Sequence, residues 1–222
     1  MPTESQQARV KRTAKIIAVL KKEFPDADTR LKYDRSNALQ SLVATILSAQ
    51  CTDDRVNIVT VELFKKYRTV KDFAEVSQEE LEADVRTCGF YRNKAKNIRA
   101  AAAMILKNFG GKVPDTMEEL LSLPGVARKT ANCVLSNAYG RNEGVVVDTH
   151  VIRLGARLGL TKHTNPVKIE QDLMKLVPQN QWGLFSHLMM FHGRAYCVAR
   201  KPKCEQCPLD GSKKLCPSYN KA

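Results

Sequence analysis

Apolar residues recur every three or four positions along most of this chain, which is the spacing of amphipathic helices. In one clear case the apolar side chains fall at positions i, i+3, i+4, i+7 and i+8, as Leu39, Leu42, Val43, Ile46 and Leu47. The same spacing predicts about ten helices, near residues 6–24, 36–49, 53–67, 77–88, 91–109, 116–122, 128–138, 148–158, 166–177 and 181–196. Only residues 145–147 resemble a strand, and one such stretch cannot form a sheet. The pattern therefore predicts an all-α protein with short turns.

No stretch of the sequence is apolar enough to cross a membrane. The longest unbroken apolar run, residues 100–106, has seven residues, whereas a membrane-spanning helix needs ~18 or more. The first fifteen residues lack an apolar core followed by a small-residue cleavage site, so we expect no secretory signal. A length of 222 residues suits one compact domain or two small lobes.

The charge balance changes the picture from a generic helical protein to one with an acidic partner. Lys and Arg number 36 against 23 Asp and Glu, for a net charge of +13. Such an excess favours binding to a polyanion or an acidic surface. We expect part of this charge on the first helix, at residues 9–15, and part near the C-terminus.

Residues 117–138 predict two helices joined by a tight turn. Pro124 ends the first helix and Gly125 permits a positive φ, so the segment predicts a helix-hairpin-helix. Backbone N–H groups at the start of the second helix can bind one phosphate without reading base sequence, and Arg128 would reinforce that contact. An ordinary helical turn with solvated charges has the same pattern, but the net charge favours contact with the DNA backbone.

Two ionisable residues near helix starts are candidates for chemistry. Lys129 lies in the first turn of a predicted helix, where the helix dipole favours a neutral amine. If it is also partly buried, its pKa falls toward the range of an amine nucleophile; a surface lysine that contacts phosphate is the alternative. Asp148 precedes another predicted helix and is a natural N-cap, and its carboxylate could also stabilise a nearby positive charge. His150 is expected to be structural.

Four of the seven cysteines lie in the last 26 residues. Cys197, Cys204, Cys207 and Cys216 have the spacing C-x6-C-x2-C-x8-C, which is typical of a metal site. Structural zinc is usually bound by two C-x2-C pairs, and only one is present here. The spacing therefore favours an iron–sulfur cluster, with zinc as the alternative. We expect Arg200 and Lys201, within this segment, to face DNA. The other cysteines, Cys51, Cys88 and Cys133, are expected to be small buried residues.

Taken together, these motifs resemble the endonuclease III family of bacterial DNA glycosylases and AP lyases. The resemblance is carried by LPGVARKTA from Leu123, VDTH from Val147, the cysteine spacing, and LSAQCTD from Leu47. It implies a two-lobed all-α fold: a six-helix barrel domain with the helix-hairpin-helix over residues 31–142, and an iron–sulfur cluster domain formed by residues 1–30 and 143–222. DNA is expected in the groove between the lobes, and the expected cofactor is a 4Fe-4S cluster held by the four cysteines.

The resemblance also implies roles for individual residues. Lys129 matches the nucleophile that forms a Schiff base, and Asp148 matches the essential carboxylate. Gln50 matches the residue that fills the gap left by the extruded nucleotide, and Phe90 matches a second wedge. The implied function is base excision repair, in which oxidised pyrimidines are removed from double-stranded DNA and abasic sites are cleaved by β-elimination. We expect a monomer in the bacterial cytoplasm, associated with the nucleoid through DNA and not with a membrane.

Two positions depart from the family pattern. Ala127 stands where a second hairpin glycine is common, and a required positive φ there would cost roughly 1 kcal/mol or more. The last cysteine spacing is x8 where x5 is usual, which lengthens the loop but keeps the ligand.

Two other functions remain as alternatives. A monofunctional mismatch glycosylase would carry a catalytic glutamate in the helix before Gln50, yet residues 36–52 contain no acidic side chain. A non-catalytic DNA-binding protein would use the same hairpin and charge only for attachment.

Overall fold

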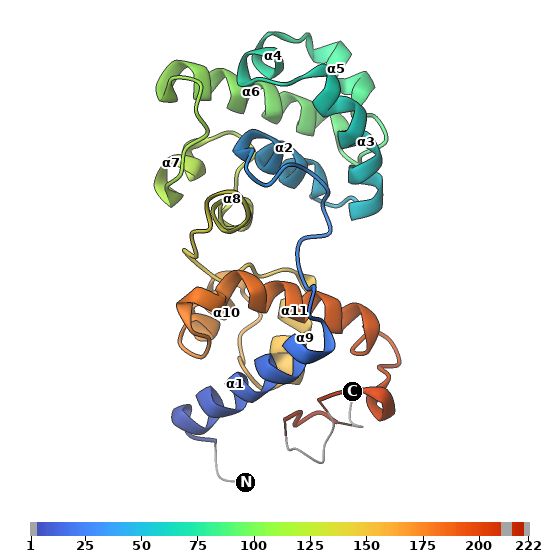
Figure 1. Ribbon diagram of the computed structural model, residues 1–222, viewed down its shortest axis with the longest axis vertical. Helices are drawn as coiled ribbons and strands as arrows, with labels where there is room; N and C mark the ends of the chain where they lie inside the picture. Colours follow the sequence, from blue (N-terminus) through green and yellow to red (C-terminus); the bar gives the residue numbers. More distant parts are fainter. Residues whose placement is uncertain (1–3, 210–214, 220–222) are drawn as a thin grey trace. The chain divides into compact units, whose positions relative to one another are not determined.

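The computed structural model describes residues 4–209 and 215–219, and within these ranges it is helical with no strand (Figure 1). The predicted all-α fold class is confirmed, and residues 145–147 are irregular. No helix in the described ranges is long and apolar enough to cross a membrane. The helices are α1 (Gln6–Glu23), α2 (Ala38–Ser48), α3 (Asp53–Lys66), α4 (Val70–Glu75), α5 (Gln78–Asp84), α6 (Tyr91–Phe109), α7 (Met117–Ser122), α8 (Arg128–Tyr139), α9 (Thr149–Arg157), α10 (Pro166–Met174) and α11 (Trp182–Ala195), with 3-10 turns at η1 (Gln179–Gln181) and η2 (Cys204–Gln206).

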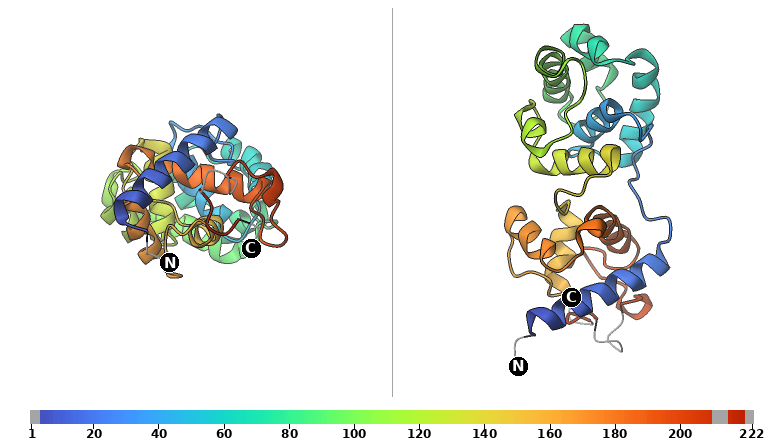
Figure 2. Two further views of the ribbon diagram at one scale, coloured as in Figure 1. Left: turned by 90° about the horizontal axis from the view of Figure 1, so that it is seen from below. Right: turned by 60° about the vertical axis from the view of Figure 1, so that its left-hand side comes forward.

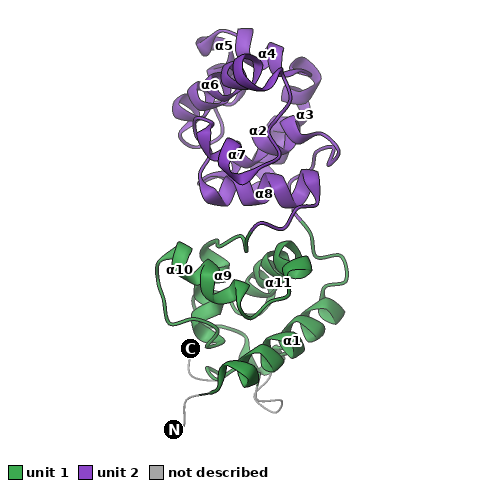
Figure 3. Cartoon of the chain, turned by 90° about the vertical axis from the view of Figure 1, so that its left-hand side faces the viewer, with its two compact units in different colours: residues 1–28, 144–222 green, residues 29–143 purple. Residues whose placement is uncertain are grey.

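The chain forms two compact units, shown in different colours in Figure 3. Unit 2 is residues 29–143, and unit 1 joins residues 1–28 to residues 144–222. The N-terminal helix thus belongs with the C-terminal part of the chain. The sequence placed these boundaries at 30/31 and 142/143, and the structure has them at 28/29 and 143/144.

Unit 2 is built around α2, whose side chains are almost all buried. The residues from Leu39 to Leu47 include eight buried ones, among them Ser41 and Thr45. This helix packs against α3, α6 and α8, while α4 and α5 pack on α6. Thr45 is accommodated in the core because its hydroxyl donates a hydrogen bond to the Ser41 carbonyl oxygen at 2.7 Å. The remaining buried side chains of the unit form one apolar core.

Unit 1 has its own apolar core, in which α1 packs along α11 (Figure 2). Ile16 and Leu20 of α1 and Phe185 of α11 are completely buried there. Arg12 of α1 ties the unit together, since its Nη1 donates to the carbonyl oxygens of Leu158 at 2.7 Å and Leu215 at 3.0 Å. Arg12, one of the basic residues that the sequence places on the first helix, thus has its guanidinium hydrogen-bonded within the protein.

The structure differs from the sequence prediction around residues 70–88. Helix α4 was not predicted, because six residues are too few for a helical period to be recognised. Its start nevertheless has a local signal: Thr69 and Asp72 form a capping box in which each side chain accepts a hydrogen bond from the other's backbone N–H. The helix predicted over residues 77–88 ends at Asp84, and the chain then turns more tightly, with the Cys88 N–H bonded to the Val85 carbonyl at 2.9 Å.

Candidate functional site

The turn between α7 and α8 has the hairpin geometry that the sequence predicts. The Val126 N–H bonds to the Leu123 carbonyl at 3.1 Å, and Gly125 has φ +77°. A Cβ on Gly125 would lie 2.7 Å from the Cβ of Asn97 on α6. Both the backbone angle and the close approach of α6 therefore require glycine at this position.

The backbone at Ala127 does not have the positive φ that would strain an alanine. Its backbone is extended, with φ −94° and ψ 168°, so no positive φ is needed and the expected cost does not arise. As the N-cap of α8 it makes no side-chain hydrogen bond, because a methyl group cannot accept one. The helix start thus lacks the usual side-chain cap at position 127, and uncapped amides at a helix N-terminus are suited to an anion.

Lys129 is the second residue of α8 and is exposed. Its side-chain amine has no hydrogen-bond or ion-pair partner among the residues of its own unit, all of which the structure describes. The suggestion that burial helps to activate this amine is therefore not met. Its neighbour Arg128 is partly buried. An exposed, unpaired amine at a helix start remains free to reach a ligand.

Gln50 and Phe90 occupy two turns with unusual backbone angles. Their φ values are +52° and +58°, a left-handed conformation that non-glycine residues seldom adopt and that costs energy to maintain. Phe90 is 64% exposed, which is far more than an aromatic ring in a stable core. Gln50, Phe90 and Gly125 line one pocket of about 210 Å³ in unit 2. The structure thus brings together three residues that the sequence assigned to DNA from three separate segments.

The same pocket contains polar residues that sequence reasoning missed. Asn93, Lys94 and Asn97 line it from α6, together with Ile46 and Ala49. Their spacing of three to four residues puts them on one face of that helix. The sequence could have shown this polar face, because the helix was predicted. Nothing in the sequence indicated that the face lies against the turn after α2.

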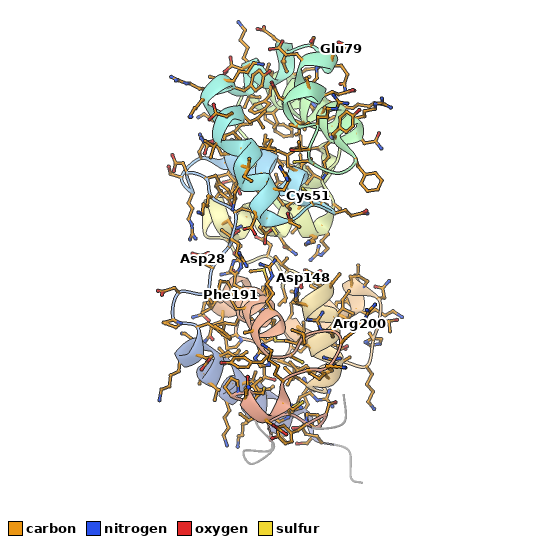
Figure 4. The ribbon with its side chains drawn as sticks, turned by 90° about the vertical axis from the view of Figure 1, so that its right-hand side faces the viewer. Asp28, Cys51, Glu79, Asp148, Phe191 and Arg200 are labelled. Atoms are coloured by element: carbon orange, nitrogen blue, oxygen red, sulfur yellow. The ribbon has the colours of Figure 1, made fainter. Side chains whose placement is uncertain are left out.

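Asp148 is held firmly at the start of α9, as the predicted N-cap (Figure 4). Its Oδ1 accepts hydrogen bonds from the backbone N–H groups of His150 at 2.9 Å and Val151 at 2.8 Å. Its Oδ2 lies 3.0 Å from His150 Nδ1. His150 is itself fixed by α11, since a Cβ on Gly193 would come within 2.8 Å of His150 Cδ2. His150 therefore has the structural role that the sequence suggested, and it orients the Asp148 carboxylate.

The four C-terminal cysteines line a single cavity in unit 1. Cys197 follows α11, and its N–H bonds to the His192 carbonyl at 3.0 Å. Cys204 begins the short η2 turn and Cys207 directly follows it, and Cys216 comes after Leu215, the first residue described beyond positions 210–214. Burial and the neighbouring thiols raise the pKa of Cys207 to about 11, although a hydrogen bond from the Leu209 backbone opposes this.

The surroundings of these sulfurs fit an anionic group bound through thiolates. Arg157 Nη1 lies 3.4 Å from Cys197 Sγ, and the Ser218 backbone forms a hydrogen bond with Cys216. Donors directed at sulfur stabilise the thiolate form, which is the form that binds iron. Within residues 4–209 and 215–219, however, no group of three or more His, Cys, Asp or Glu side chains is placed to hold a metal ion by itself.

The basic residues expected near the cysteines are partly described. Arg200 and Lys201 are exposed, and Lys201 has a positive φ of 53°. Lys213 and Lys214, in the lengthened last loop, lie outside the described residues. The segment from Arg200 to Lys203 thus displays positive charge next to the cysteine cavity.

Comparisons with known proteins agree with the helix-hairpin-helix and with the cysteine cavity. The model of the HhH-GPD superfamily of base excision DNA repair proteins matches residues 43–179, which is more than half of the chain. A curated endonuclease III from Synechocystis sp. is 53% identical over 211 residues, covering 95% of this chain and 94% of that protein. The chain belongs to the endonuclease III family. Endonuclease III from Bacillus subtilis is 46% identical over 187 residues, 84% of each chain.

The endonuclease III family also accounts for the cysteine cavity. The model of the iron–sulfur binding domain of endonuclease III matches residues 197–209, so the chain is an iron–sulfur protein. A solved structure of a trapped endonuclease III–DNA covalent intermediate is 43% identical, has a TM-score of 0.88, and covers 96% of this chain and 97% of that chain. The chain is accordingly a base excision repair enzyme of the DNA glycosylase and AP lyase class, and its partner is DNA.

Proposed function

We propose that this enzyme removes oxidised pyrimidines from double-stranded DNA and cleaves the resulting abasic sites by β-elimination, with Lys129 as the nucleophile. The observation that carries the proposal is the exposed Lys129 amine at the start of α8, immediately after a turn in which only glycine fits at position 125. A lysine in that place can be brought to a sugar when the hairpin amides bind the neighbouring phosphate.

The first step is extrusion of the damaged nucleotide from the duplex. Gln50 and Phe90 are the proposed wedges, because both project from strained turns beside the same pocket. Unstacking costs a few kcal/mol, which contacts to the DNA backbone offset. We assign those contacts to Gly125, Ala127 and Arg128 of the hairpin.

The chemical steps use one amine and one carboxylate. The neutral Lys129 Nζ attacks the anomeric carbon of the sugar, the bond to the base breaks, and the base leaves with the glycosidic electron pair. The bond between the anomeric carbon and the ring oxygen then breaks, the ring oxygen takes up a proton, and a Schiff base forms between that carbon and Lys129 Nζ. The Schiff base allows a proton to leave the adjacent sugar carbon, and the electrons released expel the 3′ phosphate. Asp148 accepts the amine proton and stabilises the positive charge that develops on the sugar; its three hydrogen bonds hold the carboxylate in one position for this role.

We assign the iron–sulfur ligands to Cys197, Cys204, Cys207 and Cys216, which line the one cavity. A bound 4Fe-4S cluster would supply cross-linking of this C-terminal segment. Arg200 and Lys201 then contribute positive charge for DNA phosphates. We propose that the enzyme acts as a monomer, in the cytoplasm with the nucleoid.

Borohydride trapping tests the nucleophile directly. The enzyme is incubated with an oligonucleotide duplex that contains one abasic site, in the presence of borohydride, which reduces a Schiff base to a stable amine. We expect a covalent enzyme–DNA band for the wild type and for Lys65→Ala, a control at another exposed lysine of unit 2, but none for Lys129→Ala. A band of undiminished intensity with Lys129→Ala would rule out this assignment.

Excision from a panel of duplexes, each with a single defined lesion, tests the substrate class. We expect oxidised pyrimidines to be excised faster than oxidised purines or mismatched normal bases. Equal or faster release of a purine would overturn the proposed substrate while leaving the Lys129 chemistry intact.

A further inference from the structure

Two turns of unit 2 that carry the proposed wedges lie against each other, and each contains a thiol. A Cβ on Gly89 would lie 3.2 Å from the Gln50 carbonyl oxygen, so the backbones of the two turns are in contact. Cys51 directly follows Gln50 and precedes Thr52, the N-cap of α3 (Figure 4), and Cys88 directly precedes Gly89. Both cysteines are free thiols, and Cys51 packs against the apolar core that contains Cys88.

The two thiols differ in their access to solvent. Cys88 is completely buried in the core of unit 2, whereas Cys51 is partly exposed at its edge. Burial raises the pKa of Cys88 to about 12, and the proximity of Cys51 acts in the same direction. Cys51 is therefore the sulfur that a small solute can reach, and Cys88 is shielded from solvent.

A buried lysine completes the cluster. Lys94 of α6 is only 5% exposed, and its Nζ donates to the Leu47 carbonyl oxygen at 2.8 Å, in the last turn of α2. Burial lowers its pKa, while the charges of Cys51 and Cys88 oppose that shift. A buried amine thus lies beside the Gln50 turn, and the proposed repair chemistry uses neither this amine nor the two thiols.

We propose that Cys51 and Cys88 form an oxidative modification site, at which a hydroperoxide converts the two thiols into a disulfide that links the Gln50 turn to the Phe90 turn. The pairing is specific because Cys51 packs against the core that contains Cys88 and the two turns already touch. Cysteine oxidation proceeds most readily at an accessible sulfur that has a second thiol next to it.

The chemistry consumes one molecule of hydrogen peroxide per disulfide. The Cys51 sulfur, as thiolate, attacks one peroxide oxygen; the O–O bond breaks, and the departing hydroxide takes up a proton to leave as water. The Cys88 sulfur then attacks the sulfenic acid on Cys51, so that the S–S bond forms and the S–O bond breaks. The hydroxyl leaves with the Cys88 proton as a second water. The thiols lose two electrons and the peroxide gains them.

The disulfide also has a functional consequence, which rests on the proposed role of the wedges. Linking the turns fixes Gln50 and Phe90 relative to each other and holds the Cys51 sulfur against the core. Side chains that must enter a duplex then lose their freedom to adjust. We expect the oxidised enzyme to excise a lesion more slowly and to recover when a dithiol reductant is added.

Peptide mapping of the iron–sulfur holoenzyme tests the site without relying on activity. The enzyme is treated with increasing hydrogen peroxide, free thiols are alkylated, and the protein is digested with trypsin without reductant. Cleavage places Cys51 in peptide 36–55 and Cys88 in peptide 87–92, each with no other cysteine. We expect these two peptides to be found linked, with the loss of two hydrogen atoms, and to separate on reduction.

Three variants sharpen the result. Cys51→Ser and Cys88→Ala should each abolish the linked peptide, and Cys133→Ser, which removes another partly exposed thiol of unit 2, should leave it unchanged. The visible absorption of the cluster is followed in the same samples, so that cluster damage is not mistaken for inhibition.

The outcomes separate this inference from the repair proposal. Linked peptides at peroxide concentrations that leave the cluster intact support the site, even if Lys129 proves not to be the nucleophile. Cys51 ending as sulfinic acid, or paired with another cysteine, would overturn it, as would the absence of any reaction before the cluster is lost.

Discussion

Each unit places one proposed catalytic side chain at the start of a helix, but the two side chains are held in opposite ways. Lys129 at the start of α8 is exposed and has no partner within its own unit. Asp148 at the start of α9 has both carboxylate oxygens engaged. A nucleophile has to reach, bond to and release a sugar, whereas a charge that stabilises an intermediate works best when it cannot move. The difference in restraint matches the difference in proposed role.

Both helix starts depend on a glycine that leaves room for a neighbouring side chain. A Cβ on Gly125 would lie 2.7 Å from Asn97 Cβ, and a Cβ on Gly193 would lie 2.8 Å from His150 Cδ2. The backbones differ, however, because Gly125 has φ +77° whereas Gly193 lies inside helix α11. Substitution at the two glycines should therefore have different effects.

Charge is distributed unequally between the units. Unit 1 has 18 Lys and Arg against 9 Asp and Glu, and unit 2 has 18 against 14. Most of the net charge of +13 thus belongs to the unit with the cysteines, and in unit 2 the basic side chains are nearly balanced by acidic ones. In the proposed roles, unit 2 contributes shape through the hairpin and wedges, and unit 1 contributes most of the attraction to phosphate.

The largest effect is expected from Asp148→Asn. An asparagine can still accept the two backbone hydrogen bonds that cap α9, but it cannot take up a proton from an amine or neutralise a positive charge. We expect the excision rate to fall by roughly 10² to 10³, the usual cost of losing one electrostatic contact to a reacting centre. The melting temperature should change little. Single-turnover excision and thermal unfolding measure the two quantities.

Asp148→Ala is the matching control, because it removes the cap as well as the charge. It should lose similar activity and also about 0.5 to 2 kcal/mol of stability. If Asp148→Asn kept nearly full activity, Asp148 would be only a capping residue and the contrast with Lys129 would fail.

The two catalytic candidates also show which features of the site could be predicted from the sequence and which could not. The cap at Asp148 could be predicted because capping depends on residues within one turn, and the hairpin turn because Pro124 and Gly125 restrict the backbone locally. The exposure of Lys129 depends on what packs around α8, and no local pattern records that. The same holds for the pocket that joins Gln50, Phe90 and Gly125, since its walls come from segments about 40 and 75 residues apart.

The short-range failures have a physical reason as well. Helix α4 is too short for its period to be counted, although its capping box could have been recognised. The proposed pairing of Cys51 with Cys88 could not be expected from the sequence, because the predicted helix over residues 77–88 placed Cys88 inside a helix, whereas the structure ends α5 at Asp84. The extended backbone of Ala127 likewise depends on a turn angle that residue identity alone does not fix.

The second prediction concerns Gly125→Ala. The left-handed backbone costs roughly 1 kcal/mol or more for alanine, and the contact with Asn97 adds about 1 to 3 kcal/mol of overpacking. We expect a loss of about 2 to 4 kcal/mol in the free energy of unfolding and weaker binding to abasic DNA. Chemical denaturation and a DNA titration measure these changes.

Gly110→Ala is a suitable control, because Gly110 has φ +58° with nothing near its absent Cβ. It should show the backbone cost alone. Equal losses in the two variants would mean that Asn97 yields easily and that close packing does not shape the hairpin.

A smaller effect is expected from Gly193→Ala. Alanine favours a helix over glycine by up to about 1 kcal/mol, which offsets part of the clash. The new methyl group should instead displace His150 and with it the hydrogen bond to Asp148. We expect stability to change by less than in Gly125→Ala, and excision to slow by roughly tenfold through misplacement of the carboxylate.

Gly155→Ala provides the comparison for a helical glycine of the same unit, since its Cβ would meet only a methyl group of Thr161 at 3.2 Å. It should leave excision nearly unchanged. A similar slowing in Gly155→Ala would show that general loosening of unit 1, and not the position of His150, controls the rate.

The smallest effect tests the division between shape and charge. Each phosphate contact contributes about 0.9 to the slope of the logarithm of DNA affinity against the logarithm of salt concentration. If Arg200 and Lys201 both contact phosphate, the double change to glutamine should reduce that slope by about 2 and weaken binding alike for damaged and undamaged duplexes. The matched change in unit 2, at Lys65 and Lys71, should leave the slope unaltered, because these lysines pair with Glu62 at 2.7 Å and Glu75 at 3.7 Å. An equal reduction from both pairs would show that the enzyme draws its attraction for DNA from both units, despite their unequal net charge.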